Sequence, residues 1–244
     1  MDQSGDHASG SELRRLFQLS RRFGVFKTLS VCLGTLDDRH LRSFDRRYRV
    51  RTSGHLELSK TSFDSSKLRH ATSYGAVNAW AFRNLLKELN LPKRLRFADL
   101  GCGLGRACIL AAEYGFEKVT GVELAHELCV VARENMSRCR LTPSAVSSVS
   151  IVQADVLDYC EHTEDDIFFI YRAFSLEFFR TVRKKLAEIA AYQNKSVTLI
   201  YTERLSWPPS HEVRELSDDH AFRKIYETSM LGQAFYVHQC GTQF

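Results

Sequence analysis

The chain has few of the residues that mark specialised classes of protein. Glycine (13) and proline (4) are too scarce among its 244 residues for a collagen-like or low-complexity chain. No apolar run approaches the roughly 18 residues of a membrane-spanning helix. The seven cysteines lack the close pairing of a zinc site or of a secreted disulfide framework. With 44% hydrophobic and 26% charged residues, the sequence predicts a folded, cytoplasmic protein with reduced thiols and no membrane span.

Positive charge is concentrated near the start of the chain. Residues 11–60 contain twelve Lys or Arg against five acids, whereas the remainder is slightly acidic. The polar residues 1–10 predict a disordered tail, and apolar residues at helical spacing predict an amphipathic helix that ends near Gly24. Residues 44–61 predict loop or short strand. A run of charges is usually a solvated face, and binding to a nucleic acid or an anionic membrane surface is the alternative. We expect residues 11–73 to form a basic extension that packs as a lid, whose arginines would favour an anionic acceptor or partner.

From residue 74 onward, short apolar runs alternate with amphipathic stretches of helix length. This pattern is typical of an α/β domain, here 74–244, with parallel strands and helices on both faces of the sheet. The expected helices cover 74–89, 105–115, 126–138 and 174–193, and the expected strands cover 95–100, 118–123, 149–153, 167–171, 197–202, 221–228 and 234–239. The last two strands leave no room for a helix between them, so they predict a terminal antiparallel hairpin.

A glycine-rich segment, Asp99–Arg106, directly follows the first of these strands and opens a helix. Loops at this position of a doubly wound sheet bind cofactors, because glycines admit sharp turns and the helix start offers unpaired N–H groups. Gly105 follows Gly103 by two residues, and Arg106 stands where the dinucleotide fingerprint requires glycine. The acid at the strand end, Asp99, favours a ligand with a cationic group over a pyrophosphate.

Two further acids end the next two strands. Glu123 is placed to accept hydrogen bonds from both hydroxyls of a ribose, and Asp155 to accept one from an exocyclic amino group such as that of adenine. Together with Asp99, they suit a ligand that carries an amino group, a ribose and an adenine. S-adenosylmethionine has all three groups.

These motifs resemble motifs I, post-I and II of the class I S-adenosylmethionine-dependent methyltransferases. The segments Phe44–Tyr48, Thr72–Tyr74 and Ala111–Phe116 are similar to a group of bacterial methyltransferases of largely unassigned substrate. The resemblance implies a Rossmann-like, seven-stranded, mostly parallel sheet with an antiparallel C-terminal hairpin, preceded by a helical N-terminal extension. It also implies a cofactor site formed by Asp99, Gly101, Cys102, Gly103, Gly105, Glu123, Leu124, Asp155 and Val156.

Catalytic residues are less clearly marked in the sequence. The candidates are Tyr74, ahead of the first strand of the sheet, and Tyr171 and Phe174, at the end of the fourth. Relatives tend to have Asn-Pro-Phe where this chain has Arg172-Ala173-Phe174, and lysine at the position of Leu104. The histidines pair with no cysteine or acid at a recognised metal-ligand spacing, so we expect no metal site.

The implied reaction is in-line displacement, in which a nucleophilic N or O of an acceptor takes the methyl group and leaves S-adenosylhomocysteine. A small-molecule acceptor ranks ahead of a protein side chain or a nucleic acid, because the chain has no recognisable RNA-binding motif. The alternative is an S-adenosylmethionine-binding protein with lost or regulatory activity, which the divergent segment after the fourth strand favours. A nicotinamide-dependent oxidoreductase is disfavoured by the glycine spacing.

Overall fold

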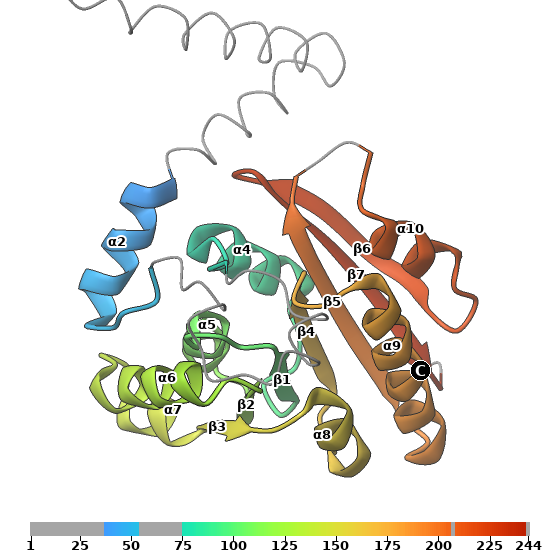
Figure 1. Cartoon of the computed structure of the whole chain (residues 1–244), viewed down its shortest axis with the longest axis horizontal. Coiled ribbons are helices and arrows are strands. Elements are labelled where there is room, and N and C mark those ends of the chain that lie inside the picture. Colours follow the sequence, from blue (N-terminus) through green and yellow to red (C-terminus); the bar gives the residue numbers. More distant parts are fainter. Residues whose placement is uncertain (1–36, 54–74, 206–207, 243–244) are drawn as a thin grey trace, which may run out of the picture.

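The computed structural model describes residues 37–53, 75–205 and 208–242. Its centre is a seven-stranded sheet in the order β3-β2-β1-β4-β5-β7-β6 (Figure 1). Strand β7 runs antiparallel to both of its neighbours, and the other adjacent pairs are parallel. The strands are β1 (Arg96–Leu100), β2 (Lys118–Glu123), β3 (Val149–Gln153), β4 (Ile167–Tyr171), β5 (Ser196–Arg204), β6 (Arg223–Met230) and β7 (Gln233–Gly241). The predicted fold class is therefore confirmed, including the antiparallel hairpin.

Helices cover both faces of this sheet. The helices are α2 (Asp37–Tyr48), α4 (Ala79–Leu89), α5 (Arg106–Tyr114), α6 (His126–Arg138), α7 (Pro143–Ser147), α8 (Val156–His162), α9 (Leu176–Tyr192) and α10 (His211–Asp218). Phe97 of β1 packs in one hydrophobic cluster with α2, α4 and α5, whereas its neighbour Ala98 packs in a second cluster with α8, α9 and α10. Successive residues of the strand thus point to opposite faces of the sheet and pack in two separate hydrophobic cores.

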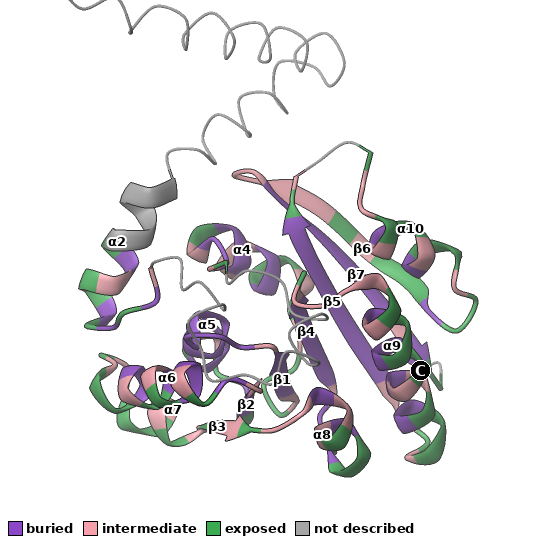
Figure 2. Ribbon diagram, viewed as in Figure 1, coloured by how far each residue is buried: buried purple, intermediate pink, exposed green. Residues whose placement is uncertain are grey.

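Strand β4 lies at the centre of the sheet, between β1 and β5. Its first four residues, Ile167–Ile170, are at most 1% exposed. A strand covered by helices on both faces needs apolar side chains in both directions, so its sequence is a continuous hydrophobic run. Figure 2 shows the same burial along β5 and β7. The polar residues of the predicted site lie at or just after the carboxyl ends of the parallel strands.

Most of the predicted elements are confirmed, with ends that differ by a few residues. The helix expected from residue 74 begins only at Ala79, because Asn78 caps it by accepting a hydrogen bond from the Ala81 N–H. Three short helices, α7, α8 and α10, were not predicted. Each has only a turn or two, too little for hydrophobic periodicity to reveal it.

The prediction of loop or short strand for residues 44–61 is wrong at its start, because residues up to Tyr48 belong to α2. Phe44 and Tyr48 lie four residues apart on the same helix face, and both are buried. The helix expected to end near Gly24 and the tail 1–10 lie outside the described residues.

Only a small part of the basic extension, residues 37–53, is described.

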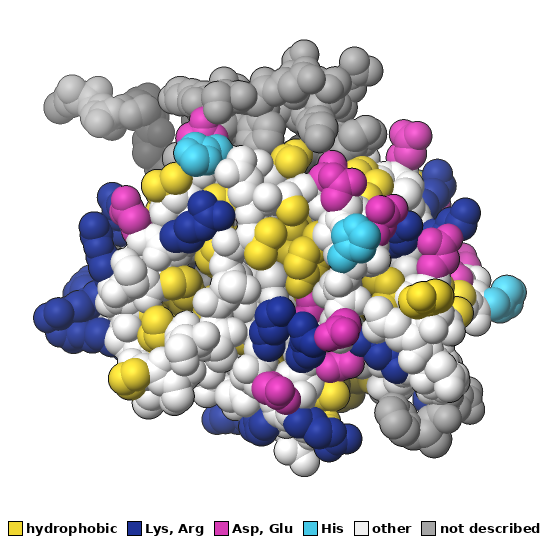
Figure 3. Space-filling model, turned by 90° about the horizontal axis from the view of Figure 1, so that it is seen from below, with side chains coloured by type: hydrophobic (Ala, Val, Ile, Leu, Met, Phe, Trp, Pro, Cys, Tyr) yellow, Lys and Arg dark blue, Asp and Glu magenta, His cyan; other side chains and the backbone are white. Residues whose placement is uncertain are grey.

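Figure 3 shows one face of the molecule. On this face, Lys and Arg side chains are interspersed with acids, and hydrophobic side chains gather near the centre. Within the described ranges, no helix is long and apolar enough to cross a membrane.

Candidate functional site

The glycine-rich loop turns sharply at the carboxyl end of β1. Gly101, Gly103 and Gly105 have φ angles of +82°, +52° and +82°, in the left-handed region that favours glycine. The N–H groups of Gly101 and Cys102 donate to the Val122 carbonyl oxygen at 2.9 and 3.0 Å. The loop is therefore tied to β2 before α5 begins.

Gly101 also allows a close approach by the connection between β4 and α9. A Cβ at Gly101 would lie 2.8 Å from the Cβ of Ala173 and 3.7 Å from the Phe174 ring. The glycine-rich loop and the end of β4 are thus in contact across the sheet. This places Phe174, one of the predicted catalytic residues, beside the predicted cofactor loop.

Glu123 fixes the loop from the end of β2. Its Oε2 accepts a hydrogen bond from the Gly103 N–H at 2.9 Å, and its Oε1 accepts one from the Ala125 N–H at 2.8 Å. Burial raises the pKa of this carboxyl, and the backbone N–H groups of Ala125, Gly103 and Leu124 oppose that increase. Each carboxylate oxygen has two lone pairs, so a carboxylate bonded in this way retains capacity for further donors.

Asp99 lies beneath the loop and is 3% exposed. The Cys108 thiol of α5 donates to its Oδ2 at 3.6 Å. Burial raises the pKa of Asp99 to about 7, and the nearby charge of Glu123 contributes to the increase, although the thiol hydrogen bond opposes it. Near neutral pH, this carboxyl is poised between its protonated and ionised forms.

Asp155 follows β3 and caps α8. Its Oδ1 accepts a hydrogen bond from the Leu157 N–H at 3.0 Å. The preceding Ala154 N–H donates to the Glu123 carbonyl oxygen at 3.1 Å, so the ends of β2 and β3 lie side by side. Among the remaining predicted cofactor residues, Cys102 and Val156 are buried, and Leu124 is partly exposed.

The predicted catalytic residues are only partly described. Tyr171 is the last residue of β4, and its ring lies 3.5 Å from the position of a Cβ at Gly75. Phe174 lies beside the loop, as stated above. Between them, Arg172 has a φ of +36°, which is unusual for a side chain with a Cβ. Tyr74 lies outside the described residues.

Arg106 has a role that the sequence did not predict. It is 2% exposed; its Nε donates to Thr52 Oγ1 at 2.7 Å, and its Nη2 lies 3.3 Å from Asp45 Oδ1. Its guanidinium also stacks 4.7 Å from the centre of the Phe44 ring. The first residue of α5 therefore holds the segment 43–53 against the loop. An arginine in place of glycine among apolar neighbours was the only signal.

Asn135 of α6 was also not predicted. Its Nδ2 donates to the carbonyl oxygens of Leu104 and Arg51, each at 3.0 Å, and its Oδ1 accepts from the Arg51 N–H at 2.8 Å. This buried amide joins the loop backbone to the N-terminal segment. Among the described residues, no group of three or more His, Cys, Asp or Glu could hold a metal ion.

Two comparisons of the sequence with known proteins match the part of the chain that contains the glycine-rich loop or name a methyltransferase. A protein family described as histone methylation protein DOT1 matches residues 59–169, which include β1 to β3, most of β4, the glycine-rich loop and the acids at the strand ends. The Bacillus subtilis (strain 168) protein YqeM, which is named as a methyltransferase, is 44% identical over 50 residues. That match covers 20% of this chain and 20% of YqeM, so the chain spans one fifth of that relative's length.

Solved structures share the fold at low sequence identity. An RNA methyltransferase from Salinibacter ruber in complex with S-adenosyl-L-homocysteine has a TM-score of 0.52 at 15% identity, and the match covers 70% of this chain and 96% of that one. A mutant of MtNAS in complex with S-adenosylmethionine has a TM-score of 0.51 at 15% identity, covering 67% and 61%. The pyocyanin biosynthetic protein PhzM has a TM-score of 0.53 at 17% identity, covering 66% and 54%. These likenesses confirm the predicted fold.

Proposed function

We propose that this chain, which has the fold of the class I S-adenosylmethionine-dependent methyltransferases, transfers the methyl group of that cofactor to a nucleophilic N or O atom of an acceptor. The observation that carries the proposal is the meeting of three acids and a glycine-rich loop at one edge of the sheet. Two of the solved neighbours were crystallised with S-adenosylhomocysteine or S-adenosylmethionine, which supports the same cofactor here.

The residues at this edge fit such a cofactor. The left-handed loop glycines keep the backbone free of side chains where a ligand would approach it. Glu123, with lone pairs beyond those that bind Gly103 and Ala125, would accept the ribose hydroxyls. Asp155 would accept from the adenine amino group, beside Leu124 and Val156. These carboxylates are hydrogen-bond acceptors, which suit a ligand that donates from ribose hydroxyls and from an amino-substituted base.

Asp99 would face the amino group of the methionine part, together with the loop backbone from Gly101 to Gly105. A cationic ammonium beside this buried carboxyl would favour its ionised form and lower its pKa from about 7. Cofactor binding would then release a proton near neutral pH. Measuring this proton release therefore distinguishes direct contact between Asp99 and the cofactor from a role of Asp99 only in packing beneath the loop.

The bound cofactor supplies an electrophilic methyl group. What the protein contributes is the alignment of the acceptor and the exclusion of water, and positioning of this kind can lower a barrier by roughly 7–11 kcal/mol. Tyr171 ends β4 beside Gly75, and Phe174 lies in the following connection beside Gly101 of the loop, so they are the described candidates for this alignment. The Tyr171 hydroxyl would hydrogen-bond to the acceptor, and Phe174 would exclude water from its side of the site.

We favour a small molecule as the acceptor. The DOT1 match ends at residue 169 and so covers the half of the chain with the cofactor motifs, before Arg172–Phe174 and β5 to β7. It therefore bears on the cofactor more than on the acceptor. A pocket of about 340 Å³ between α2 and α4 has the size of a small-ligand site, for which volumes of roughly 300–1,000 Å³ are usual.

The proposal is tested in two steps. Calorimetry should detect binding of S-adenosylmethionine and S-adenosylhomocysteine, with dissociation constants of roughly 1 μM to 1 mM. The protein is then incubated with methyl-labelled cofactor and with cell extract divided into small-molecule, protein and RNA fractions, and label should enter the small-molecule fraction. Absence of binding would contradict the cofactor. Binding without transfer to any fraction would favour the alternative, a cofactor-binding protein without methyltransferase activity.

A further inference from the structure

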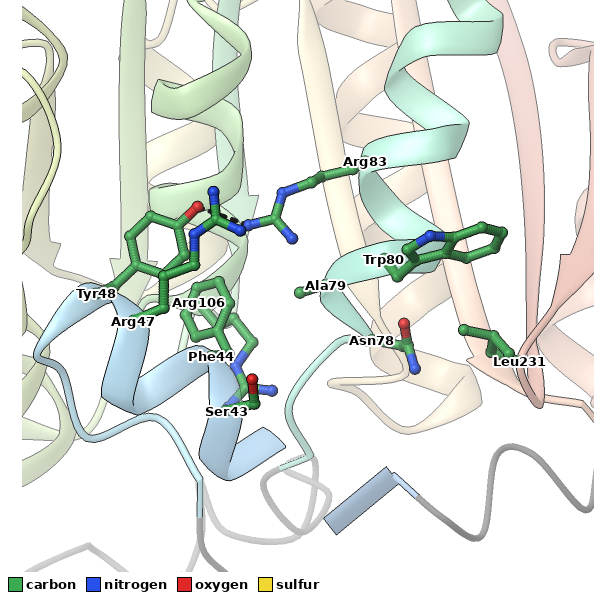
Figure 4. A pocket seen from close by; sticks show the side chains of 10 residues that line it. All are labelled: Ser43, Phe44, Arg47, Tyr48, Asn78, Ala79, Trp80, Arg83, Arg106 and Leu231. Carbon is green, nitrogen blue, oxygen red and sulfur yellow. Dashed lines mark hydrogen bonds between the residues drawn. The ribbon is translucent and has the colours of Figure 1, made fainter. Parts of the chain in front are cut away.

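A pocket of about 340 Å³ lies between α2, the start of α4 and the turn that joins β6 to β7 (Figure 4). It is lined by Ser43, Phe44, Arg47, Tyr48, Asn78, Ala79, Trp80, Arg83, Arg106 and Leu231. Three of these residues are arginines, three are aromatic and none is an acid. This composition is typical of a site for a planar anion.

Two of the arginines are held in place by other residues. Arg83 donates from Nε to Glu113 Oε2 at 2.6 Å and from Nη2 to the Tyr48 hydroxyl at 2.7 Å. Arg106 is fixed by Asp45 and its neighbours, as described above. Ion pairs of this kind lock the rotamers of long side chains, so the two guanidinium groups form a preorganised wall. The acids that fix them balance only part of the positive charge.

Arg47 supplies the remaining charge. It is exposed on α2, and within the described part of the chain it forms no ion pair; its guanidinium lies 5.6 Å from the centre of the Tyr48 ring. In Figure 4 it points toward the same side of the pocket as Arg83. A guanidinium that no carboxylate neutralises is available to an anionic ligand.

Trp80 forms the opposite side of the pocket. Figure 4 shows its indole beside Asn78 and Leu231, across from Phe44 and Tyr48. The residue is 57% exposed, which is high for so large an apolar side chain. In Figure 4 the indole extends toward Leu231, and an exposed indole at the border of a pocket offers a face on which a flat ring can stack.

The pocket adjoins the proposed cofactor site. Arg106 lines the pocket and directly follows Gly105, the last glycine of the loop. On the other wall, Asn78 is three residues from Gly75, which packs against the Tyr171 ring at the end of β4. Two residues that line the pocket, Arg106 and Asn78, are thus close in the chain to the loop and to the residue that contacts Tyr171.

We infer that this pocket binds the methyl acceptor, and that the acceptor is a planar small molecule with an anionic group. That the ligand accepts a methyl group rests on the proposed function. That the ligand is planar and anionic rests on the residues that line the pocket. The anionic group would contact Arg47 and Arg83, and the ring would lie against Trp80.

Tryptophan fluorescence provides a direct readout. The chain has two tryptophans, so Trp207→Phe leaves Trp80 as the single reporter. In this background, 4-hydroxybenzoate should change the Trp80 emission saturably. Its neutral isostere 4-hydroxybenzamide should bind at least about tenfold more weakly, the effect of losing one charge-assisted hydrogen bond. Saturating S-adenosylhomocysteine should leave the response in place, because the two ligands occupy adjoining sites.

Neighbouring arginines give a matched pair of variants. Arg47→Gln removes a guanidinium that lines the pocket, whereas Arg46→Gln removes one from the same exposed helix turn outside it. Arg47→Gln should weaken 4-hydroxybenzoate binding by about tenfold, and Arg46→Gln by less than about twofold. Both variants should bind S-adenosylhomocysteine like the parent and keep the parent's circular dichroism.

Several results would overturn the inference. They are the absence of a saturable response to 4-hydroxybenzoate, equal affinity for the charged and neutral probes, and equal losses in the two arginine variants. Displacement of the probe by S-adenosylhomocysteine would assign the pocket to the cofactor instead. If S-adenosylhomocysteine itself fails to bind while the probe binds normally, the proposed function fails and the anion pocket stands.

Discussion

Arg106 and Asp45 form an ion pair at the point where the glycine-rich loop becomes α5. The two groups lie 3.3 Å apart, with side-chain exposures of 2% and 15%. Asp45 also accepts hydrogen bonds from the N–H groups of Thr52 and Ser53. This ion pair, with the hydrogen bonds of Arg106 to Thr52 and Ser53, therefore fastens the N-terminal segment to the helix that follows the loop.

Replacement of Arg106 should be strongly destabilising. Arg106→Ala leaves Asp45 without its buried partner, and such a loss costs about 3–5 kcal/mol. Arg106→Lys should restore little, because an ammonium cannot reproduce the directions of the guanidinium hydrogen bonds. Urea unfolding measures both. As a control, Arg51→Ala breaks an exposed pair with Glu134 and should cost less than about 1 kcal/mol; equal losses would refute the special role of Arg106.

Asp155 can be tested without loss of its helix cap. Serine is also a good N-cap, so Asp155→Ser should preserve α8 while it removes the carboxylate assigned to adenine. We expect S-adenosylhomocysteine binding to weaken by about 1.5–3 kcal/mol, the value of a charge-assisted hydrogen bond. Calorimetry checks this against Asp158→Ser, an exposed acid in the first turn of the same helix, which should bind like the parent. Matching affinities in the two variants would remove Asp155 from the site.

Substitutions at Gly101 and Ala173 can distinguish the cost of a steric clash from the cost of backbone strain. Gly101→Ala places a Cβ 2.8 Å from that of Ala173 and adds it at a φ of +82°, so it should lower both stability and cofactor affinity. Adding Ala173→Gly removes the clash and leaves the strain of about 1–2 kcal/mol. Denaturation and calorimetry on both variants and the double variant should show partial recovery. Full recovery would mean that the backbone conformation imposes no cost.

Asp99 should make stability depend on pH. The unfolded carboxyl ionises near pH 3.8 and the folded one near pH 7, so the folded state binds the proton more tightly and loses stability as pH rises across this range. Asp99→Asn cannot ionise and can still accept from Cys108. It should therefore be more stable than the parent above pH 7, by roughly 2–4 kcal/mol, with the difference shrinking as the pH falls. Urea unfolding across this pH range checks it, and a difference that does not vary with pH would contradict the raised pKa.

The same carboxyl tests where the cofactor's amino group lies. If the ammonium contacts Asp99, binding lowers the pKa from about 7 and releases up to one proton near neutral pH. Calorimetry of S-adenosylhomocysteine in buffers of different ionisation enthalpy measures this release. Asp99→Asn should release none of it. Equal release by the parent and the variant would leave Asp99 with a packing role only.

The cofactor loop could be predicted because its signals are local. Asp99 and Glu123 lie at the carboxyl ends of β1 and β2, Asp155 follows β3 by two residues, and in a parallel sheet these ends meet at one edge. The glycine spacing lies within a single turn of chain. Strand ends and loop could therefore be placed from sequence, whereas the hydrogen bond from Gly103 to the Glu123 side chain depends on the folded distance between them.

The N-terminal contacts could not be predicted, because they join residues far apart in the chain. Arg106 meets Asp45 across 61 positions, and Asn135 meets Arg51 across 84. Nothing in the local pattern around any of these residues identifies its partner. The end of α2, residues 44–48, was also not predicted, because the serine, threonine and glycine that follow Arg51 led to a prediction of loop for the whole range 44–61.

The position of β7 governs the order in which the sheet can be completed. It is synthesised after β6 but inserts between β5 and β6, so until β7 emerges β6 has no neighbour in the sheet and β5 is paired only with β4. Until then β5, whose side chains are almost all buried in the folded protein, presents an open apolar edge. We therefore expect the emerging chain to pass through a stage in which one side of β5 is unpaired, and unpaired strand edges promote aggregation.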